Sequence, residues 1–134
     1  MRRVTTYRLT TEMPPIPSRD PAALLPLTPA MFHVLVALAD GDHHGYAILK
    51  RVAEYTEGRV QLSTGTLYGI VKRLLADGLV EEPKRRPPAA DDDERRKYYR
   101  LTAFGRAVVA AETQRLEAMV SAARATRAFR KAHA

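Results

Sequence analysis

Residues 63–78 read STGTLYGIVKRLLADG, and this segment decides the fold of the chain. Ser63 is a residue type that begins helices, and Gly78 is one that ends them. The sequence therefore predicts a helix from Ser63 to Asp77. Its apolar residues recur at helical spacing and predict a single buried face, formed by Leu67, Ile70, Val71 and Leu74.

The opposite face of this helix carries small and basic residues: Gly65, Thr66, Gly69, Lys72, Arg73 and Ala76, with Tyr68 at the edge. A glycine inside a helix costs roughly 0.8–1 kcal/mol relative to alanine, so two of them call for a compensating reason. A smooth face with basic edges fits the major groove of DNA, which admits one helix. It also fits tight packing against a neighbouring element, and this segment alone leaves both interpretations open.

The flanking elements complete a recognisable order. Thr28 and Pro29 predict the start of a helix that ends near Ala39, and a second helix is expected over residues 45–57. After Gly78, short strands are predicted over residues 79–84 and 97–101, joined by a polar, proline-rich loop. Three helices followed by a hairpin indicate a mainly α fold with a small β-hairpin, the winged helix-turn-helix, whose third helix enters the major groove.

A last helix is predicted over residues 103–127, capped by Thr102. Its apolar stripe can pair with the same helix of a second copy or fold back on its own domain. For pairing, the expected dimer contacts are Val108, Val109, Leu116, Met119, Val120 and Ala123. The predicted organisation is thus a flexible proline-rich arm (1–26), a winged helix-turn-helix domain (27–102), a dimerisation helix (103–127) and a disordered basic tail (128–134).

The composition of the 134 residues narrows the function. The chain is 46% hydrophobic, enough for one core, and it has no cysteine, which excludes disulfides and thiolate metal sites. No apolar run reaches the ~20 residues of a membrane span, so a cytoplasmic location is expected. A formal net charge of +7 suggests a polyanionic partner.

The excess of positive charge lies in two places. One is the predicted dimerisation helix with its tail, and the other is the hairpin. The tip of the hairpin loop, residues 91–94, is acidic and would repel phosphate. Contacts of the wing with DNA are therefore expected from the basic residues on either side of the tip, which are Lys84, Arg85, Arg86, Arg95, Arg96 and Lys97.

Residues 28–125, some three-quarters of the chain, resemble the PadR family of bacterial transcriptional regulators, and five short stretches within them carry the resemblance. They are His44-Gly45-Tyr46, Gly65-Thr66-Leu67-Tyr68 with Lys72-Arg73-Leu74, Asp77-Gly78-Leu79-Val80, Arg95-Arg96-Lys97-Tyr98-Tyr99-Arg100-Leu101-Thr102, and Gly105-Arg106. The resemblance implies a winged-helix homodimer, held together by C-terminal helices, that represses promoters until an effector arrives. The single C-terminal helix is similar to the smaller subfamily. Thr64 departs from the family, which often has proline before the glycine.

The expected function is sequence-specific binding of operator DNA. Thr66, Tyr68, Lys72 and Arg73 would face bases and phosphates, with Tyr46 and Ser63 as contacts to the backbone and Thr64 beside them. The resemblance also implies an effector pocket between the dimer helices, and no residue identifies its ligand. No cofactor is expected.

Two other classes of function remain as alternatives. Asp40, Asp42, His43 and His44 crowd one turn and could suggest a metal enzyme, although adjacent histidines usually face different ways and no second cluster supplies ligands. A winged helix can also use its basic faces to bind another protein without recognising a DNA sequence. Competition by nonspecific DNA would separate that alternative from operator binding.

Overall fold

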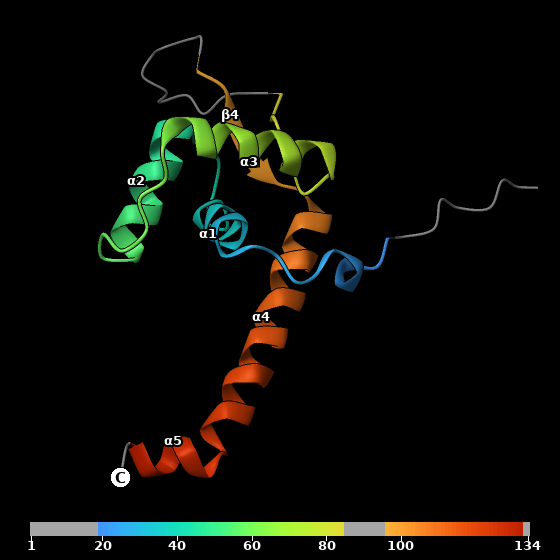
Figure 1. The fold of residues 1–134 in the computed structure, drawn as a ribbon. Helices are drawn as coiled ribbons and strands as arrows, with labels where there is room; N and C mark the ends of the chain where they lie inside the picture. Colours follow the sequence, from blue (N-terminus) through green and yellow to red (C-terminus); the bar gives the residue numbers. More distant parts are fainter. Residues whose placement is uncertain (1–18, 85–95, 133–134) are drawn as a thin grey trace, which may run out of the picture.

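The computed structural model describes residues 19–84 and 96–132. Within these ranges the chain forms, in order, the 3-10 helix η1 (Pro21–Leu24), α1 (Pro29–Ala37), β2 (His43–His44), α2 (Gly45–Tyr55), α3 (Thr64–Ala76), β3 (Val80–Glu81), β4 (Tyr98–Leu101), α4 (Ala103–Arg124) and α5 (Arg127–Ala132). The predicted fold class, mainly α with a small β-hairpin in a winged helix-turn-helix, is confirmed. Figure 1 shows α3 at one end of the molecule and α5 at the other, joined by the length of α4.

The helices begin where the hydroxyl caps were predicted. The side-chain oxygens of Thr28, Ser63 and Thr102 accept hydrogen bonds from the backbone N–H groups three residues later, at 3.1, 3.1 and 2.9 Å. Each cap satisfies one N–H group that the first helical turn leaves without a partner. The cap of α2 was not foreseen: His44 Nδ1 accepts from the N–H of Ala47 at 3.2 Å.

The small sheet has three strands in the order β2-β4-β3, and both pairings are antiparallel. The β3–β4 pair is the predicted hairpin, with Val80 opposite Leu101. The added strand β2 consists of His43 and His44 alone, which lie opposite Tyr99 and Tyr98. This pairing connects the start of α2 to β4, so that the two histidines of the suspected metal cluster are part of the sheet.

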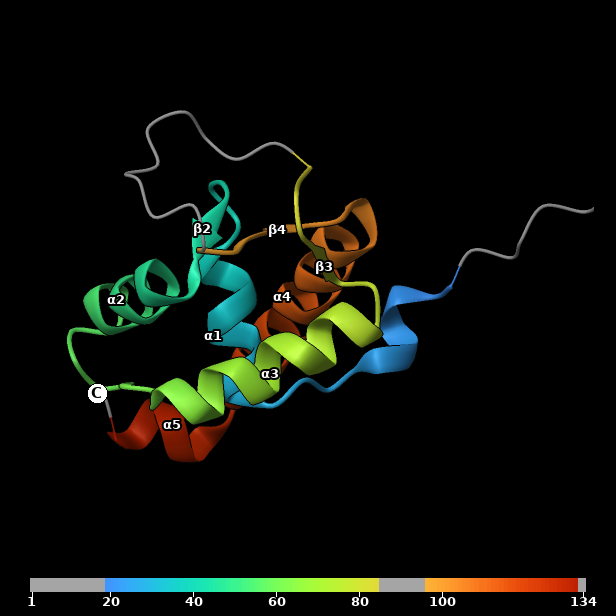
Figure 2. The same ribbon diagram turned by 90° about the horizontal axis from the view of Figure 1, so that it is seen from above.

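The core lies where α1, α2 and α3 meet and the first part of α4 closes over them (Figure 2). It contains the apolar face predicted for α3, with Leu67, Val71 and Leu74 buried and Ile70 half-buried against them. The neighbouring elements contribute the other fully buried apolar side chains of large volume, which are Val34, Leu35, Leu38, Ile48, Val52, Leu79 and Val108.

The N-terminal segment corrects the predicted arm. Residues 19–26 were assigned to a flexible stretch, but they include η1, which is capped by Asp20 and contacts α4. Leu24 and Leu25 pack against the core, and Leu27 is buried in it. These leucines attach the segment to the core. The prediction of a flexible arm rested on the prolines around them, but proline prevents a long helix without preventing a short one. Residues 1–18 of the predicted arm lie outside the described residues.

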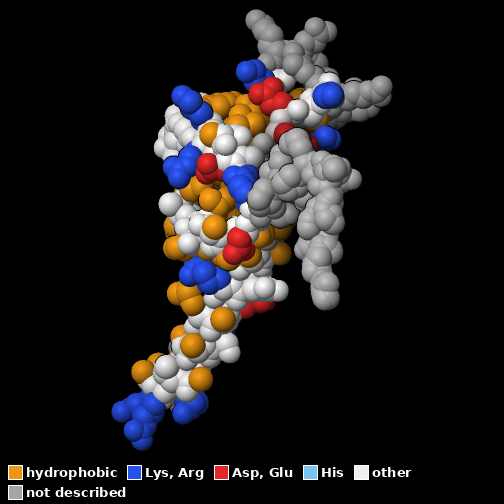
Figure 3. Space-filling view, turned by 90° about the vertical axis from the view of Figure 1, so that its right-hand side faces the viewer, with side chains coloured by type: hydrophobic (Ala, Val, Ile, Leu, Met, Phe, Trp, Pro, Cys, Tyr) orange, Lys and Arg blue, Asp and Glu red, His pale blue; other side chains and the backbone are white. Residues whose placement is uncertain are grey.

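The C-terminal prediction was wrong in two respects. The segment expected as a disordered tail includes most of α5, whose bounds are Arg127–Ala132. Val108, expected in a dimer contact, is fully buried in the core of its own chain. It faces inward because α4 first packs on the domain and only its later turns extend beyond it. Figure 3 shows hydrophobic side chains along that extension and basic side chains at its end.

Candidate nucleic-acid interface

The small face of α3 is open to solvent. Gly65, Thr66, Gly69 and Lys72 are all exposed, on the side of the helix away from the buried Leu67 and Leu74. A Cβ built at Gly65 or at Gly69 meets nothing within 4 Å. Packing within the chain therefore does not require either glycine, and the alternative of a smooth helix packed on its own domain is removed for the described residues.

The first turn of α3 presents hydroxyl groups to solvent. Ser63, Thr64 and Thr66 are exposed, and the Ser63 hydroxyl donates to the Thr66 Oγ1 at 2.9 Å while it caps the helix. The end of a helix with partly positive N–H groups and short hydroxyl side chains suits contact with a phosphate backbone. The three residues remain predicted DNA contacts.

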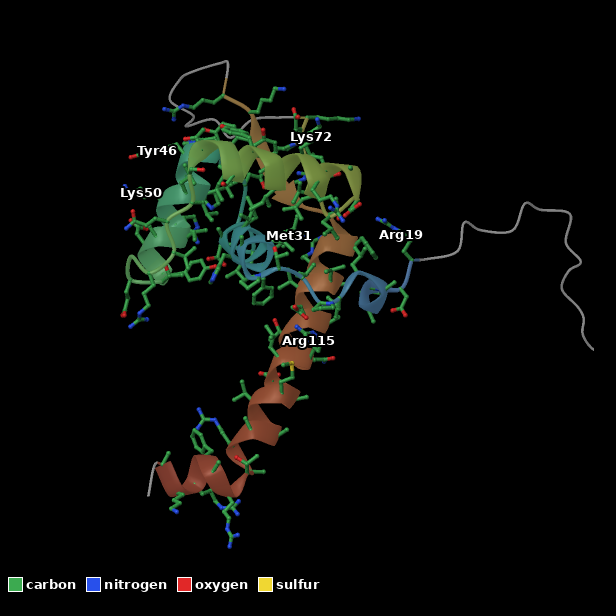
Figure 4. The ribbon with its side chains drawn as sticks, viewed as in Figure 1. Arg19, Met31, Tyr46, Lys50, Lys72 and Arg115 are labelled. Carbon is green, nitrogen blue, oxygen red and sulfur yellow. The ribbon has the colours of Figure 1, made fainter. Side chains whose placement is uncertain are left out.

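The two basic residues of α3 differ in their surroundings. Arg73 Nε lies 3.1 Å from Asp77 Oδ2, one turn later on the same helix, so its charge is partly offset. Lys72 forms no salt bridge within residues 19–84 and 96–132. In Figure 4 Lys72 lies at the end of the molecule that carries α3, whereas Arg115 lies on α4 beyond the core.

A second group of predicted DNA contacts meets at a shallow hollow of about 100 Å³. We call it the junction hollow, because it lies where the start of α2, the middle of α3 and the residues just before β4 meet. Tyr46 and Tyr68 are 66% and 47% exposed there. A Cβ at Gly45 would overlap the Tyr68 hydroxyl, so glycine leaves room for the end of the Tyr68 side chain at the start of α2. The residues that line the hollow are His44, Gly45, Tyr46, Tyr68, Arg96 and Lys97.

The remaining predicted wing contacts are only partly described. Lys84, Arg96 and Lys97 are exposed. Arg85, Arg86 and Arg95 lie outside the described residues. Behind the wing, Arg100 Nε donates to Glu81 Oε2 at 2.9 Å across the β3–β4 pair. Such a cross-strand pair joins the two strands at the base of the wing.

Burial shifts the pKa values of two groups in the sheet behind this surface. It lowers the pKa of His43, with a smaller contribution from the positive charge of Arg51. It raises the pKa of Tyr99, which lies opposite His43 in the sheet. Both shifts favour the uncharged form of the side chain. His43 and Tyr99 therefore pack as neutral groups in the sheet behind the candidate interface.

The turn at residues 40–44, which the sequence suggested as a metal site, does not bring possible metal ligands together. His43 and His44 are adjacent residues of one strand, and neighbouring side chains of a strand point to opposite faces. Within residues 19–84 and 96–132, no group of three or more histidine or carboxylate side chains is placed to hold a metal ion. In the same part of the chain, no helix is long and apolar enough to cross a membrane.

The extension of α4 carries a second exposed surface. Met119 and Val120 are 55% and 51% exposed. An apolar groove of about 410 Å³ runs beside them between α4 and α1, and we call it the α4 groove. Of the other predicted dimer contacts, Val109 packs against the core, Leu116 is half-buried and Ala123 is exposed. The groove is lined by Phe32, Thr113, Leu116, Glu117, Val120, Ser121 and Arg124.

Sequence reasoning missed three residues that the structure brings to notice. His44 lies in the junction hollow and also caps α2, a role that histidine fills less often than the hydroxyl and amide side chains. Glu112 is a buried carboxylate within the apolar pattern of α4. Arg19 stacks over the Phe104 ring, 4.1 Å from its centroid, and donates to the Asp77 carbonyl at the end of α3. Only His44 carried a signal, through the His44-Gly45-Tyr46 stretch.

Solved structures with the same fold are regulators. A PadR family transcription regulator from Clostridium difficile shares 26% identity with a TM-score of 0.59, over 69% of this chain and 91% of that one. BpsR of Bordetella bronchiseptica, whose DNA binding is regulated by 6-hydroxynicotinic acid, shares 29% identity with a TM-score of 0.54, over 79% and 73%. Bacillus subtilis PadR, solved with operator DNA, shares 20% identity with a TM-score of 0.53, over 64% and 47%, and supports the fold alone.

None of the curated proteins matches the sequence. The family comparison is decisive instead, because residues 34–111 match the transcriptional regulator PadR-like family. This range covers more than half of the chain and includes α2, α3, the β3–β4 pair and residues 103–111 of α4. The resemblance found in the short stretches is thereby confirmed, and the enzyme alternative is set aside. The chain belongs to the PadR-like family and is a transcriptional regulator.

Proposed function

We propose that this regulator binds specific sites in double-stranded DNA through the exposed face of α3, with the wing and the junction hollow on the flanking backbone. The observation that carries the proposal is the pair of glycines, Gly65 and Gly69, which packing within the chain does not require. Two glycines on a helix face allow the backbone to approach base edges closely at those positions, and the basic residues at its borders hold phosphates. BpsR of Bordetella bronchiseptica, which has this fold and whose DNA binding is regulated by 6-hydroxynicotinic acid, supports this function.

The active form is proposed to be a homodimer. The later turns of α4 present Val120, Met119 and the α4 groove, and a second copy is the occupant that suits them. A two-fold dimer places two recognition helices on two half-sites of DNA. Its dimer contacts are Val109, Leu116, Met119, Val120 and Ala123, without Val108.

Regulation is proposed to be repression that a small-molecule effector relieves. The effector would change the spacing of the two recognition helices, and this spacing decides whether both half-sites can be bound together. The regulation of BpsR by 6-hydroxynicotinic acid supports an effector in a protein of this fold. A protein that binds promoters works where the DNA is, which in a prokaryotic cell is the cytoplasm.

The test of DNA binding begins with a duplex selected by the purified protein from a random-sequence pool. Affinity for it is measured by fluorescence anisotropy for the wild type, Lys72→Ala and Lys50→Ala. Lys50 is an exposed lysine of α2 and provides the matched control, because its removal changes the net charge equally. We expect Lys72→Ala to lose at least tenfold in affinity and Lys50→Ala to lose little. Equal affinities for all three proteins would remove α3 from the interface.

A further inference from the structure

The α4 residues that line the α4 groove form one continuous face of the helix. They recur at intervals of three and four positions, so they lie above one another over about three turns. Phe32 of α1 forms the other wall of the groove. Every residue from Glu117 to Arg124 is exposed, so the later turns of this face are open to solvent. A groove of this form can take a second helix along its length.

Two opposite charges mark the exposed part of this face. Glu117 lies three positions before Val120, and Arg124 lies three positions after Ser121. All four residues line the groove, and the charges stand on either side of its centre. Both charged side chains are exposed, and within residues 19–84 and 96–132 neither takes part in a salt bridge. The face therefore matches a copy of itself that runs in the opposite direction.

Arg124 also stacks on an aromatic ring. Its guanidinium lies over the ring of Phe129, 5.3 Å from the centroid. A guanidinium stacks through its flat face and donates hydrogen bonds within its plane. The stacking therefore holds the charge at the last turn of α4 without using its N–H groups.

A two-fold dimer imposes a definite condition on these charges. If residue i meets residue j of the partner, then residue j must meet residue i. When the two faces are antiparallel about an axis beside Val120, Glu117 of each copy lies opposite Arg124 of the other. The same arrangement brings Val120 against its own counterpart and Leu116 against the small Ala123. The apolar and the charged parts of the face are thus satisfied by one register.

Charge opposes the parallel arrangement of the same two helices. In a parallel two-fold pair each residue meets its own counterpart, so Glu117 would face Glu117 and Arg124 would face Arg124. The basic ends of both copies would also lie together, and like charges at short range repel. Figure 3 shows these basic side chains at the end of the α4 extension. The antiparallel arrangement separates the two basic ends and places each beside an acidic residue of the other copy.

We propose that Glu117 and Arg124 select a second copy of this chain as the occupant of the α4 groove, and that they fix its antiparallel register through two reciprocal ion pairs. This inference rests on the proposed homodimer and specifies how the chain recognises itself. The apolar contacts of Val120 and Leu116 provide affinity, and the charge pairs decide orientation and partner. A chain of the same fold without this charge pattern would not exchange subunits with this regulator.

Two charge reversals test the pairing, because each should fail alone and both should succeed together. Glu117→Arg has two basic groups on the face, and Arg124→Glu has two acidic groups. Alone, each variant places like charges opposite each other twice per dimer. We expect sedimentation equilibrium at low ionic strength to give each a dimer dissociation constant at least about tenfold above the wild-type value. An equimolar mixture restores both opposite-charge contacts, so native mass spectrometry should show mainly heterodimers.

A double variant that combines both reversals keeps the wild-type net charge. It should dimerise as tightly as the wild type, but it should form few hybrids with isotope-labelled wild-type chains, because a hybrid places like charges together. Both effects should fade in about 1 M salt, which screens exposed charges. The controls are Ala122→Glu and Ala122→Arg, at an exposed position about 200° around the helix from Val120. Both should dimerise and exchange subunits like the wild type.

Two results would overturn the proposal. If the wild type is a dimer while Glu117→Arg and Arg124→Glu dimerise equally well and mix without preference, the contact uses another register or another surface. If the double variant exchanges freely with the wild type, the charges do not select the partner. A wild-type chain that stays monomeric at every concentration would instead show that the proposed homodimer itself has failed, and that result requires no variant.

Discussion

The carboxylate of Glu112, in the middle of α4, accepts a hydrogen bond from the backbone N–H of Leu27 at 3.1 Å, across 85 positions of sequence. Arg115, one turn further along α4, donates to both oxygens of the same carboxylate, at 2.6 and 3.0 Å. Glu112 is 1% exposed, so a charged group is buried with its hydrogen bonds satisfied. This cluster attaches the N-terminal segment to the helix that carries the proposed dimer surface.

Replacing Glu112 by alanine removes the acceptor for both partners. We expect Glu112→Ala to lower the free energy of unfolding by about 2–3 kcal/mol, because the Leu27 N–H is left buried without a partner while Arg115 can still reach water. Urea unfolding followed by circular dichroism measures the change. Glu117→Ala, an exposed glutamate on the same helix, is the control and should cost well under 1 kcal/mol. Equal losses in the two variants would mean that the cluster contributes nothing specific.

The same cluster predicts a dependence of stability on pH. Hydrogen bonds from Arg115 hold the pKa of Glu112 below its ordinary value of 4.5, against burial, which acts in the opposite direction. A carboxyl group whose folded pKa is depressed stabilises the fold above its unfolded pKa and loses that contribution as the pH falls through the folded value. We expect wild-type stability to decline below about pH 4.5 more steeply than that of Glu112→Gln. Parallel acid-unfolding curves would contradict this.

Side chains added at Gly69 should separate stability from DNA binding. Gly69→Ala and Gly69→Gln both introduce better helix formers at an exposed position with free space, so the free energy of unfolding should rise by about 0.5–1 kcal/mol. Affinity for the selected duplex should fall from glycine to alanine to glutamine as the side chain holds the helix away from the groove. Thermal unfolding and fluorescence anisotropy on the same samples provide both measurements. Full affinity in Gly69→Gln would show that this face of α3 does not approach DNA closely.

A charge in the α4 groove should disrupt the proposed dimer. Leu116→Glu places a carboxylate on the apolar lining, and burying it against a second copy without a partner is costly. We expect light scattering to report the monomer mass for Leu116→Glu and the dimer mass for Gln114→Glu, which adds the same charge at an exposed position outside the groove lining. Dimer mass in both variants would place the contact elsewhere.

Local signals predicted the framework of the fold. The caps at Thr28, Ser63 and Thr102 were each read from one hydroxyl residue followed by a helical pattern, because a cap depends on atoms three residues apart. The apolar face of α3 was likewise apparent, since its period is a property of the helix itself. The candidate interface on the opposite face was foreseen for the same reason.

Contacts between distant segments were not predictable in this way. Nothing near His43 indicates that it pairs with Tyr99, because a strand of two residues has no period to detect. The burial of Val108 depends on where α4 crosses the domain. The helix pattern alone assigned this side chain to the dimer contact, whereas it is buried in the core of its own chain.

The sequence by itself determined helices α1 to α4, the hairpin and the membership of the family, because each is encoded in residues close together along the chain. Only the tertiary structure decided that residues 19–27 are attached to α4 through Glu112, and that His44, Tyr68 and Arg96 meet in one hollow. Those relationships arise from the packing of segments far apart in sequence, whose relative positions are set by the core as a whole and leave no local pattern.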